Sequence, residues 1–261
     1  MRALGWRPGL AFGVLVAVIA VGCESVPITG RSQIMLVSPG DETKMGVQSY
    51  RDIVSKSAVS KDPAVNALVV RVGQRIAAAT GRTDLQWEYT VIEDKQANAF
   101  ALPGGKIAVY TGILPITRDE AGLAAVIGHE VGHVIARHGG ERVSQQMVTE
   151  MGISAVMAGL GSGNPVITQG VGAALGVGAS YGVLMPFGRQ QESEADHIGL
   201  ILMAKAGYDP RAARDLWIRF GQAAQGSQRP PEWLSTHPSE DTRVKQIEEW
   251  LPEALQHYKP K

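Results

Sequence analysis

The chain has a single cysteine, Cys23, among its 261 residues. No disulfide can therefore form within it. An excess of basic charge is also missing, because 25 Lys and Arg residues balance 25 Asp and Glu residues. Without a basic stripe, no nucleic-acid partner is expected. No repeat period is visible either, so the sequence predicts no helical repeat domain.

The first residues have the features of a secretion signal. Arg2 and Arg7 give a positive start, and Leu10–Val21 is an uninterrupted run of apolar or small residues. At about 1.5 Å per residue, a helix over this run is too short to span a bilayer comfortably. Residues 1–22 are therefore predicted to be a lipoprotein signal peptide, with a plain signal peptide or an uncleaved anchor as the alternatives.

Cys23 is the predicted lipidation site, since Ala20–Cys23 resembles a bacterial lipobox. Acylation would leave no thiol for nucleophilic catalysis or for a metal. Glu24 stands where Asp would be the commonest inner-membrane retention signal, which favours the outer membrane and a periplasm-facing protein. Residues 23–37 are then expected to form an extended lipidated tether. Residues 38–261 are long enough for one domain with an ample core.

The segment Gly128–His133 is an HExxH motif within a helix-forming run. On a helix, His129 and His133 project from one face, one turn apart, as two ligands of one zinc ion would. Glu130 is rotated by about 100°, so it misses the metal but can reach a water bound to it. This combination is the core of a zinc peptidase. The alternative is a chance match in which the histidines are simply packed.

One helix is predicted from Thr117 to about His138. Thr117 and Glu120 have capping-box spacing, which would fix its start. Gly128 and Gly132 weaken the helix slightly and leave room beside the metal. On a straight helix His138 lies about 180° from His129, so it is expected to cap or pack near the helix end.

The third ligand is predicted in Gln191–His197, which opens a second helical run. Glu192 and Asp196 are four residues apart and share a face, whereas Glu194 points elsewhere. We therefore assign Glu192 as a ligand and Asp196 as the acceptor that orients a ligating histidine. The alternative is that these residues are solvated helix charges.

Together, GHExGH and the downstream E-x-x-A-D resemble the signature of metallopeptidase family forty-eight. Asn98–Gly105 resembles the N-A-F-x-x-P-G-G motif of this family, and His237 with Pro238 and Arg243 resembles its H-P-x-x-x-x-R motif. Pro27–Gln33 resembles the start of its small bacterial lipoprotein members. The resemblance extends from about residue 26 to 250.

The resemblance implies one Zn²⁺ per chain, held by His129, His133 and Glu192. Glu130 would be the general base. His237 resembles a residue that in some members closes onto the metal as a fourth ligand and keeps the enzyme latent; the alternative is an ordinary loop histidine. Arg243 resembles a residue that lines the active site near the substrate; the alternative is an ordinary charge on a helix face.

The expected fold class is α+β, mostly α-helical: a zincin-like (gluzincin) domain with a small β-sheet or hairpin beside the HExxH helix. Turn and periodicity signals predict helices over about 39–57, from 63, from 209 through 220, and over about 238–250. Strands are predicted at 87–92, 99–102 and 106–110. Residues 151–188, rich in Gly and Ala, are expected to form close-packed helices or a mobile lid rather than a membrane span.

The strand beside the metal is the predicted substrate-binding edge, formed by Asn98, Ala99, Phe100 and Ala101. An extended substrate could pair with it through main-chain hydrogen bonds, which would give broad sequence tolerance. A purely structural hairpin is the alternative.

The sequence therefore predicts a zinc endopeptidase of the bacterial envelope. By resemblance, its substrates are unfolded or misfolded envelope and outer-membrane proteins, and the outer-membrane assembly machinery is a possible partner. One alternative is a chaperone-like binding lipoprotein that assists outer-membrane protein assembly and has latent protease activity. A structural zinc domain is the other.

Overall fold

The computed structural model describes residues 23–159, 185–225, 234, 237 and 241–260. The expected signal peptide and residues 160–184 of the Gly/Ala-rich segment lie outside the described residues. The helices are α2 (Pro39–Ser55), α3 (Pro63–Thr80), α4 (Leu114–Thr117), α5 (Glu120–Ile135), α6 (His138–Gly159), α8 (Met185–Lys205), α9 (Arg211–Gln225) and α11 (Asp241–His257), with a 3₁₀ turn η1 (Thr111–Ile113). The strands are β1 (Cys23–Ser25), β2 (Ser32–Ile34), β3 (Glu88–Ile92), β4 (Ala99–Leu102) and β5 (Lys106–Tyr110).

The expected α+β, mostly helical fold is confirmed, and several helix starts match their sequence signals. Ser38 is the N-cap of α2, and its side chain accepts a hydrogen bond from the backbone N–H of Asp41. Asp62 caps α3 in the same way, with Pro63 at the first helical position. Gly81 ends α3 in the left-handed conformation at φ 68°.

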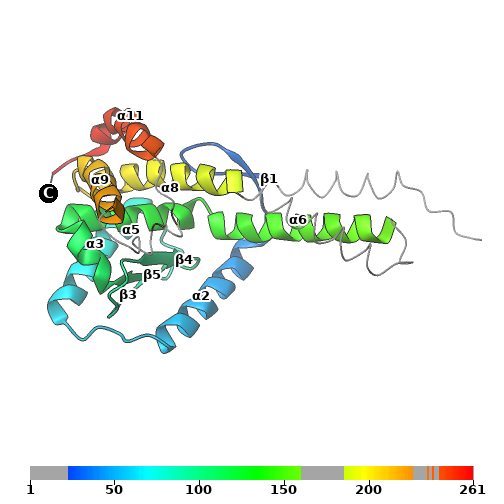
Figure 1. Cartoon of the computed structure of the whole chain (residues 1–261), viewed down its shortest axis with the longest axis horizontal. Coiled ribbons are helices and arrows are strands. Elements are labelled where there is room, and N and C mark those ends of the chain that lie inside the picture. Colours follow the sequence, from blue (N-terminus) through cyan, green and yellow to red (C-terminus); the bar gives the residue numbers. More distant parts are fainter. Residues whose placement is uncertain (1–22, 160–184, 226–233, 235–236, 238–240, 261) are drawn as a thin grey trace, which may run out of the picture.

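The three strands β3, β4 and β5 form one mixed sheet in the order β3-β5-β4. β3 pairs with β5 in parallel, and β4 pairs with β5 antiparallel across the turn Pro103–Gly105. Gly104 and Gly105 in this turn have φ values of 88° and 81°, which favour glycine. In the described part of the chain β4 is therefore an edge strand, and it packs beside α5 (Figure 1).

The centre of the fold is α5, of which every residue from Gly122 to Gly132 is buried. Helix α8 lies along it, α3 and the sheet cover one side, and α9 covers another; α11 packs on α8 and α9 (Figure 1). α5 and α8 approach each other closely. A Cβ added at Gly132 would lie only 2.7 Å from the Ala195 carbonyl oxygen. A Cβ at Gly128 would likewise lie 2.9 Å from the Gly199 carbonyl oxygen. The glycines of the motif thus make room for α8 itself.

The start of the predicted 117–138 helix is wrong. Thr117 ends the short helix α4, and Arg118 has a φ of 67°. The N-cap of α5 is Asp119, whose carboxylate accepts a 2.8 Å hydrogen bond from the Gly122 N–H. Asp is a strong N-cap and stands next to the first helical residue, so it replaces the expected capping box.

The predicted helix is also interrupted before its end. α5 ends at Ile135, and Arg137 adopts a φ of 59°, which breaks the helical path. A new helix, α6, starts at His138 and leads away from the body of the protein (Figure 1). His138 therefore does not lie where a straight helix would put it.

Residues 23–37 are packed against the helices and do not form the expected extended tether. β1 and β2 pair antiparallel, and we call residues 23–34 the N-terminal hairpin. Gln33 is buried, and its Nε2 donates a 3.0 Å hydrogen bond to the carbonyl of Ala136. The Leu36 N–H donates to Ser144 Oγ at 2.8 Å. The hairpin thus covers the junction between α5 and α6.

Two further boundaries bear on the sequence predictions. α11 continues to His257, beyond the expected end near residue 250. α6 continues into the Gly/Ala-rich segment as far as Gly159. Within the described residues, none of the helices combines the length and the apolar character needed to cross a bilayer.

Candidate metal centre

The HExxH residues lie on the buried face of α5 against α8. His129 and His133 direct their Nε2 atoms toward each other at 3.1 Å. From α8, Glu192 places Oε2 3.4 Å from Nε2 of His129 and Oε1 3.4 Å from Nε2 of His133. The structure thus brings together the two histidines and the carboxylate that the sequence singled out.

A third histidine completes the cluster. His237 is buried, with Nδ1 3.2 Å from Nε2 of His129 and 2.9 Å from Oε2 of Glu192. One ligand atom from each of His129, His133, Glu192 and His237 lies within 4.8 Å of the others. His237 therefore belongs to the cluster. From the sequence alone, an ordinary loop histidine was an equal alternative.

The donor set fits a tetrahedral zinc ion. Zn–N and Zn–O distances of about 2.0–2.1 Å require the ligand atoms of a regular tetrahedron to lie roughly 3.3–3.4 Å apart. Five contacts among the four side chains measure 2.9 to 3.4 Å, with Glu192 contributing Oε1 to one of them and Oε2 to two. One donor atom from each side chain lies within 4.8 Å of the others. Imidazole nitrogens with one carboxylate oxygen are also ligands that zinc accepts. The group can therefore hold a single metal ion.

Glu130 stands beside this donor set without joining it. Its carboxylate is 3% exposed, and Oε1 lies 3.3 Å from Nε2 of His237. It also lines the same cleft as His133. A carboxylate at this position is next to the fourth vertex of the tetrahedron, where a general base must be.

His129 is oriented by Asp196. The Nδ1 atom of His129 lies 2.8 Å from Oδ1 of Asp196, so its other nitrogen, Nε2, is left for the metal. Burial acts to lower the pKa of His129, but hydrogen bonds to Asp196 and Glu192 outweigh it and raise the pKa to about 9. For His133, by contrast, burial dominates and holds the pKa well below its usual value.

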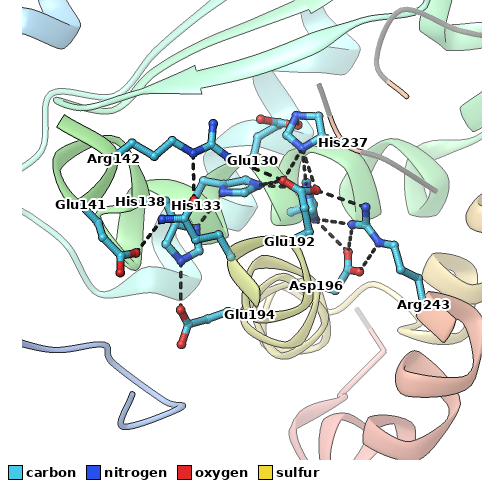
Figure 2. A network of polar contacts seen from close by, with 12 residues as sticks. Glu130, His133, His138, Glu141, Arg142, Glu192, Glu194, Asp196, His237 and Arg243 are labelled. Carbon is cyan, nitrogen blue, oxygen red and sulfur yellow. Dashed lines mark hydrogen bonds and ion pairs between the residues drawn. The ribbon is translucent and has the colours of Figure 1, made fainter. Parts of the chain in front are cut away.

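Arg243, which lies on α11, holds Asp196 in place. Its Nε and Nη2 atoms each donate to Asp196 at 2.7 Å, and Nη1 donates to Glu192 at 3.1 Å (Figure 2). The guanidinium also lies 3.6 Å from the ring centroid of Trp217. Burial would raise the pKa of Asp196, but the charge of Arg243 and the hydrogen bond from His129 lower it.

The position of Arg243 excludes one of the two sequence interpretations. Its side chain is 4% exposed, so it is not an ordinary charge on a helix face. It contacts Glu192 and His129 at the metal cluster, as expected of a residue that lines the site, and it is not among the residues that line the cleft. The geometry makes it a positioning residue for Asp196 and Glu192.

Sequence reasoning missed His138. Because the chain turns at Arg137, Nδ1 of His138 comes within 2.8 Å of Nδ1 of His133. Its Nε2 lies 3.0 Å from Oε2 of Glu194 (Figure 2). Burial lowers the pKa of His138 despite the nearby carboxylate, so the ring is neutral at pH 7. Gly139 was a sequence signal for a helix interruption here.

The expected substrate edge lies partly along the site. A cleft of about 210 Å³ is lined by the sheet edge, α5, α6 and the metal cluster, including Phe100, Ala101, Leu102, Glu130, His133, Arg142 and His237. Of the residues predicted for the edge, Phe100 and Ala101 line the cleft. Ala99 is buried, and the Asn98 carbonyl accepts a hydrogen bond from the Tyr110 N–H. The accessible part of the edge is therefore the second half of β4.

Comparisons with known proteins agree on one family. The model for peptidase family M48 matches residues 63–251. Mitochondrial metalloendopeptidase OMA1 of Schizosaccharomyces pombe is 39% identical over 250 residues, which cover 93% of this chain and 72% of the relative.

Two other relatives are longer than this chain. Human mitochondrial metalloendopeptidase OMA1 is 28% identical over 94% of this chain and 49% of its own length. The beta-barrel assembly-enhancing protease of Escherichia coli is 26% identical over 90% of this chain and 49% of its own length. The chain therefore spans about half the length of these two proteins.

Proposed function

The chain belongs to peptidase family M48, and from this premise we propose that it is a zinc-dependent endopeptidase whose general base is Glu130. One observation carries the proposal. Four donor atoms, from His129, His133, Glu192 and His237, lie within 4.8 Å of one another and could hold one metal ion, and Glu130 lies 3.3 Å from His237. A purely structural site has no use for a buried carboxylate beside its ligands.

The roles of the residues follow from their positions. Bound Zn²⁺ would supply Lewis-acid polarisation of the scissile carbonyl and a water of lowered pKa, about 7. Glu130 takes the proton of the attacking water and delivers it to the leaving amine. Asp196 and Arg243 hold the ligands His129 and Glu192 in place.

The substrate lies along β4 in an extended conformation. The cleft is lined by Glu130 and by residues of β4, which is an edge strand among the described residues. Backbone pairing at Phe100 and Ala101 would align a peptide bond of the substrate with the metal, with few contacts to the substrate's side chains. The enzyme therefore has broad sequence tolerance and acts on unfolded chains.

His237 keeps the site latent. Its Nδ1 would occupy the fourth ligand position, which a catalytic zinc ion keeps for water. The supporting distances are 3.2 Å to Nε2 of His129 and 2.9 Å to Oε2 of Glu192. Turnover therefore requires His237 to leave this position. A latent state suits a protease with low sequence specificity.

The substrates are misfolded or stalled proteins of the bacterial envelope. The support is the lipobox-like Ala20–Cys23, together with a relative in Escherichia coli that is named for enhancing β-barrel assembly. The protein would face the periplasm on a lipid carried by Cys23, which is exposed. Cys23→Ser expressed in a Gram-negative host should leave the membrane fraction and lose labelling by palmitate. Unchanged fractionation and labelling would contradict the anchor.

The first experiment measures zinc content and cleavage of unfolded casein by the full chain in mild detergent. Wild type and Glu130→Gln should each carry about one zinc ion, and wild type alone should cleave. A fully active Glu130→Gln would refute the assigned base. Zinc in both with no cleavage, together with unfolding by a chelator, would identify a structural zinc domain instead.

A chaperone-like binding role remains the second candidate, favoured by the closed arrangement at His237. Such a role needs no proton transfer, so Glu130→Gln would still support assembly of outer-membrane proteins in cells. Loss of that support in Glu130→Gln would leave proteolysis as the function.

A further inference from the structure

The N-terminal hairpin is tied to two buried carboxylates by one arginine. Arg31 donates from Nε to Glu194 at 2.8 Å, and from Nη1 and Nη2 to the two oxygens of Glu141 at 2.7 and 2.8 Å. The side chains of Arg31, Glu141 and Glu194 are 13%, 1% and 4% exposed. Thr29 of the same hairpin also donates to Glu194.

Glu194 links this hairpin to a metal ligand. Its Oε2 lies 3.0 Å from Nε2 of His138, and Nδ1 of His138 lies 2.8 Å from Nδ1 of His133. Since a carboxylate can only accept, His138 donates from Nε2 and is left with Nδ1 as an acceptor. His133 then donates from Nδ1 and keeps Nε2 for the metal.

We propose that Arg31, Glu194 and His138 form a relay that positions the ligand His133. The proposal rests on the proposed function, because it needs a metal at Nε2 of His133. Histidine ligands commonly donate their second ring N–H to an outer acceptor, and loss of that acceptor weakens metal binding. The hairpin that starts at Cys23 is thus a part of the metal site.

The relay has a counterpart on the other histidine. Asp196 accepts from Nδ1 of His129, and Arg243 of α11 compensates its charge. In both cases a carboxylate of α8 orients a ligating histidine ring, Asp196 directly and Glu194 through His138. Each carboxylate is held by an arginine from a distant segment. Because Glu194 is two residues from Glu192, α8 directs one carboxylate to the metal and the other to the opposite side (Figure 2).

A hairpin that merely anchors the chain would give a different result from a positioning relay. Weaker anchoring lowers the melting temperature and leaves the metal site unchanged. Loss of the acceptor changes the orientation of His133 itself. The affinity for zinc and the visible absorption spectrum of the cobalt-substituted protein therefore separate the two roles.

The test uses the full chain with zinc or cobalt alone as the probe. His138→Phe keeps a ring but removes the acceptor, so zinc should bind about 10- to 100-fold more weakly in chelator competition, with an altered cobalt spectrum. His138→Gln restores an acceptor oxygen and should recover part of the affinity. Glu194→Gln keeps the side-chain volume, removes the charge, and should weaken zinc binding by about tenfold.

The matched control is Glu253→Gln, which breaks another histidine–carboxylate pair, 2.7 Å long, between His197 and the exposed Glu253. Its zinc affinity and cobalt spectrum should equal those of wild type. Wild-type affinity and spectrum in both His138→Phe and Glu194→Gln, whatever their melting temperatures, would overturn the relay alone. A wild-type protein that binds no zinc would overturn the proposed function and the relay together.

Discussion

The guanidinium of Arg243 donates two hydrogen bonds of 2.7 Å to Asp196, one to each carboxylate oxygen. Both side chains are almost fully buried. A two-point contact of this kind fixes the plane of the carboxylate as well as its position. Asp196 in turn fixes the ring of His129, so α11 determines the orientation of a ligand on α5.

Substitution of Arg243 should therefore affect both stability and metal binding. Arg243→Ala leaves the buried Asp196 without its counter-charge and should lower the free energy of unfolding by about 3–5 kcal/mol. Arg243→Lys keeps the charge but loses the two-point contact, and should weaken zinc binding by about tenfold or more. Denaturant titration of the metal-free protein and chelator competition measure these effects.

An exposed ion pair between α11 and a different helix, α9, provides the control. Arg214 of α9 donates to Glu248 of α11 at 2.6 Å, and both side chains are over 40% exposed. Arg214→Ala should lower the free energy of unfolding by about 1 kcal/mol or less and leave zinc affinity unchanged. Equal losses in Arg214→Ala and Arg243→Ala would contradict the positioning role of Arg243.

The spacing of α5 and α8 should depend on Gly132. A Cβ here would meet the Ala195 carbonyl oxygen at 2.7 Å, and a helix backbone cannot move aside without shifting its neighbours. Gly132→Ala should therefore cost about 1–3 kcal/mol of stability. It should also weaken zinc binding, because α8 carries Glu192. The two measurements are the denaturation midpoint and the zinc affinity.

Gly221 of α9 is the matched glycine, since a Cβ there meets nothing within 4 Å. Gly221→Ala should raise stability by about 0.5–1 kcal/mol through helix propensity alone. If Gly132→Ala is stabilised as much as Gly221→Ala, the close contact between α5 and α8 does not determine the site.

The parts of the site that follow local patterns could be predicted from the sequence. His129, His133 and Glu130 obey helix geometry within one motif, and the four-residue spacing of Glu192 and Asp196 places both on the inner face of α8. The strands and the N-caps Ser38 and Asp62 were equally local. Such features need no knowledge of how distant segments meet.

The rest depends on tertiary contacts that leave little trace in the sequence. The helix break at Arg137 needs a left-handed backbone at a residue that seldom adopts it, so the approach of His138 to His133 could not be foreseen. The bonds from Arg31 reach residues more than 100 positions away. For Arg243 the resemblance implied a place at the active site, but its contacts with Asp196 and Glu192 depend on how α11 packs on α8.

The protein should lose stability at alkaline pH through Tyr89. This ring on β3 packs against Gly73 of α3, and burial raises its pKa to about 12. In the unfolded chain a tyrosine ionises near pH 10. The raised pKa means that this contribution to stability is fully present below about pH 10 and is lost as the pH rises toward about 12, because the unfolded state ionises first.

Tyr89→Phe removes this loss. Its denaturation midpoint should fall less steeply than that of wild type between pH 9 and about 11.5, measured by denaturant titration at each pH. The two proteins compared at pH 7 give the baseline, since the phenol is neutral there in both states. Parallel pH profiles for the two proteins would show that Tyr89 contributes nothing to alkaline unfolding.

Removal of His237 should activate the protease and weaken its hold on zinc. Without this side chain the fourth position is open to water, while His129, His133 and Glu192 still bind the ion. If the open form is roughly 10% populated in wild type, His237→Ala should raise casein cleavage by up to about tenfold. Cleavage rates at saturating zinc test this, since one ligand fewer lowers the affinity.

His257, an exposed histidine at the end of α11, gives the control for the loss of an imidazole. His257→Ala should cleave casein at the wild-type rate. The double variant Glu130→Gln, His237→Ala should be inactive, because an open site without its base cannot transfer the proton. An unchanged or lower rate in zinc-loaded His237→Ala would show that His237 supports the reaction or the fold, and that latency has another cause.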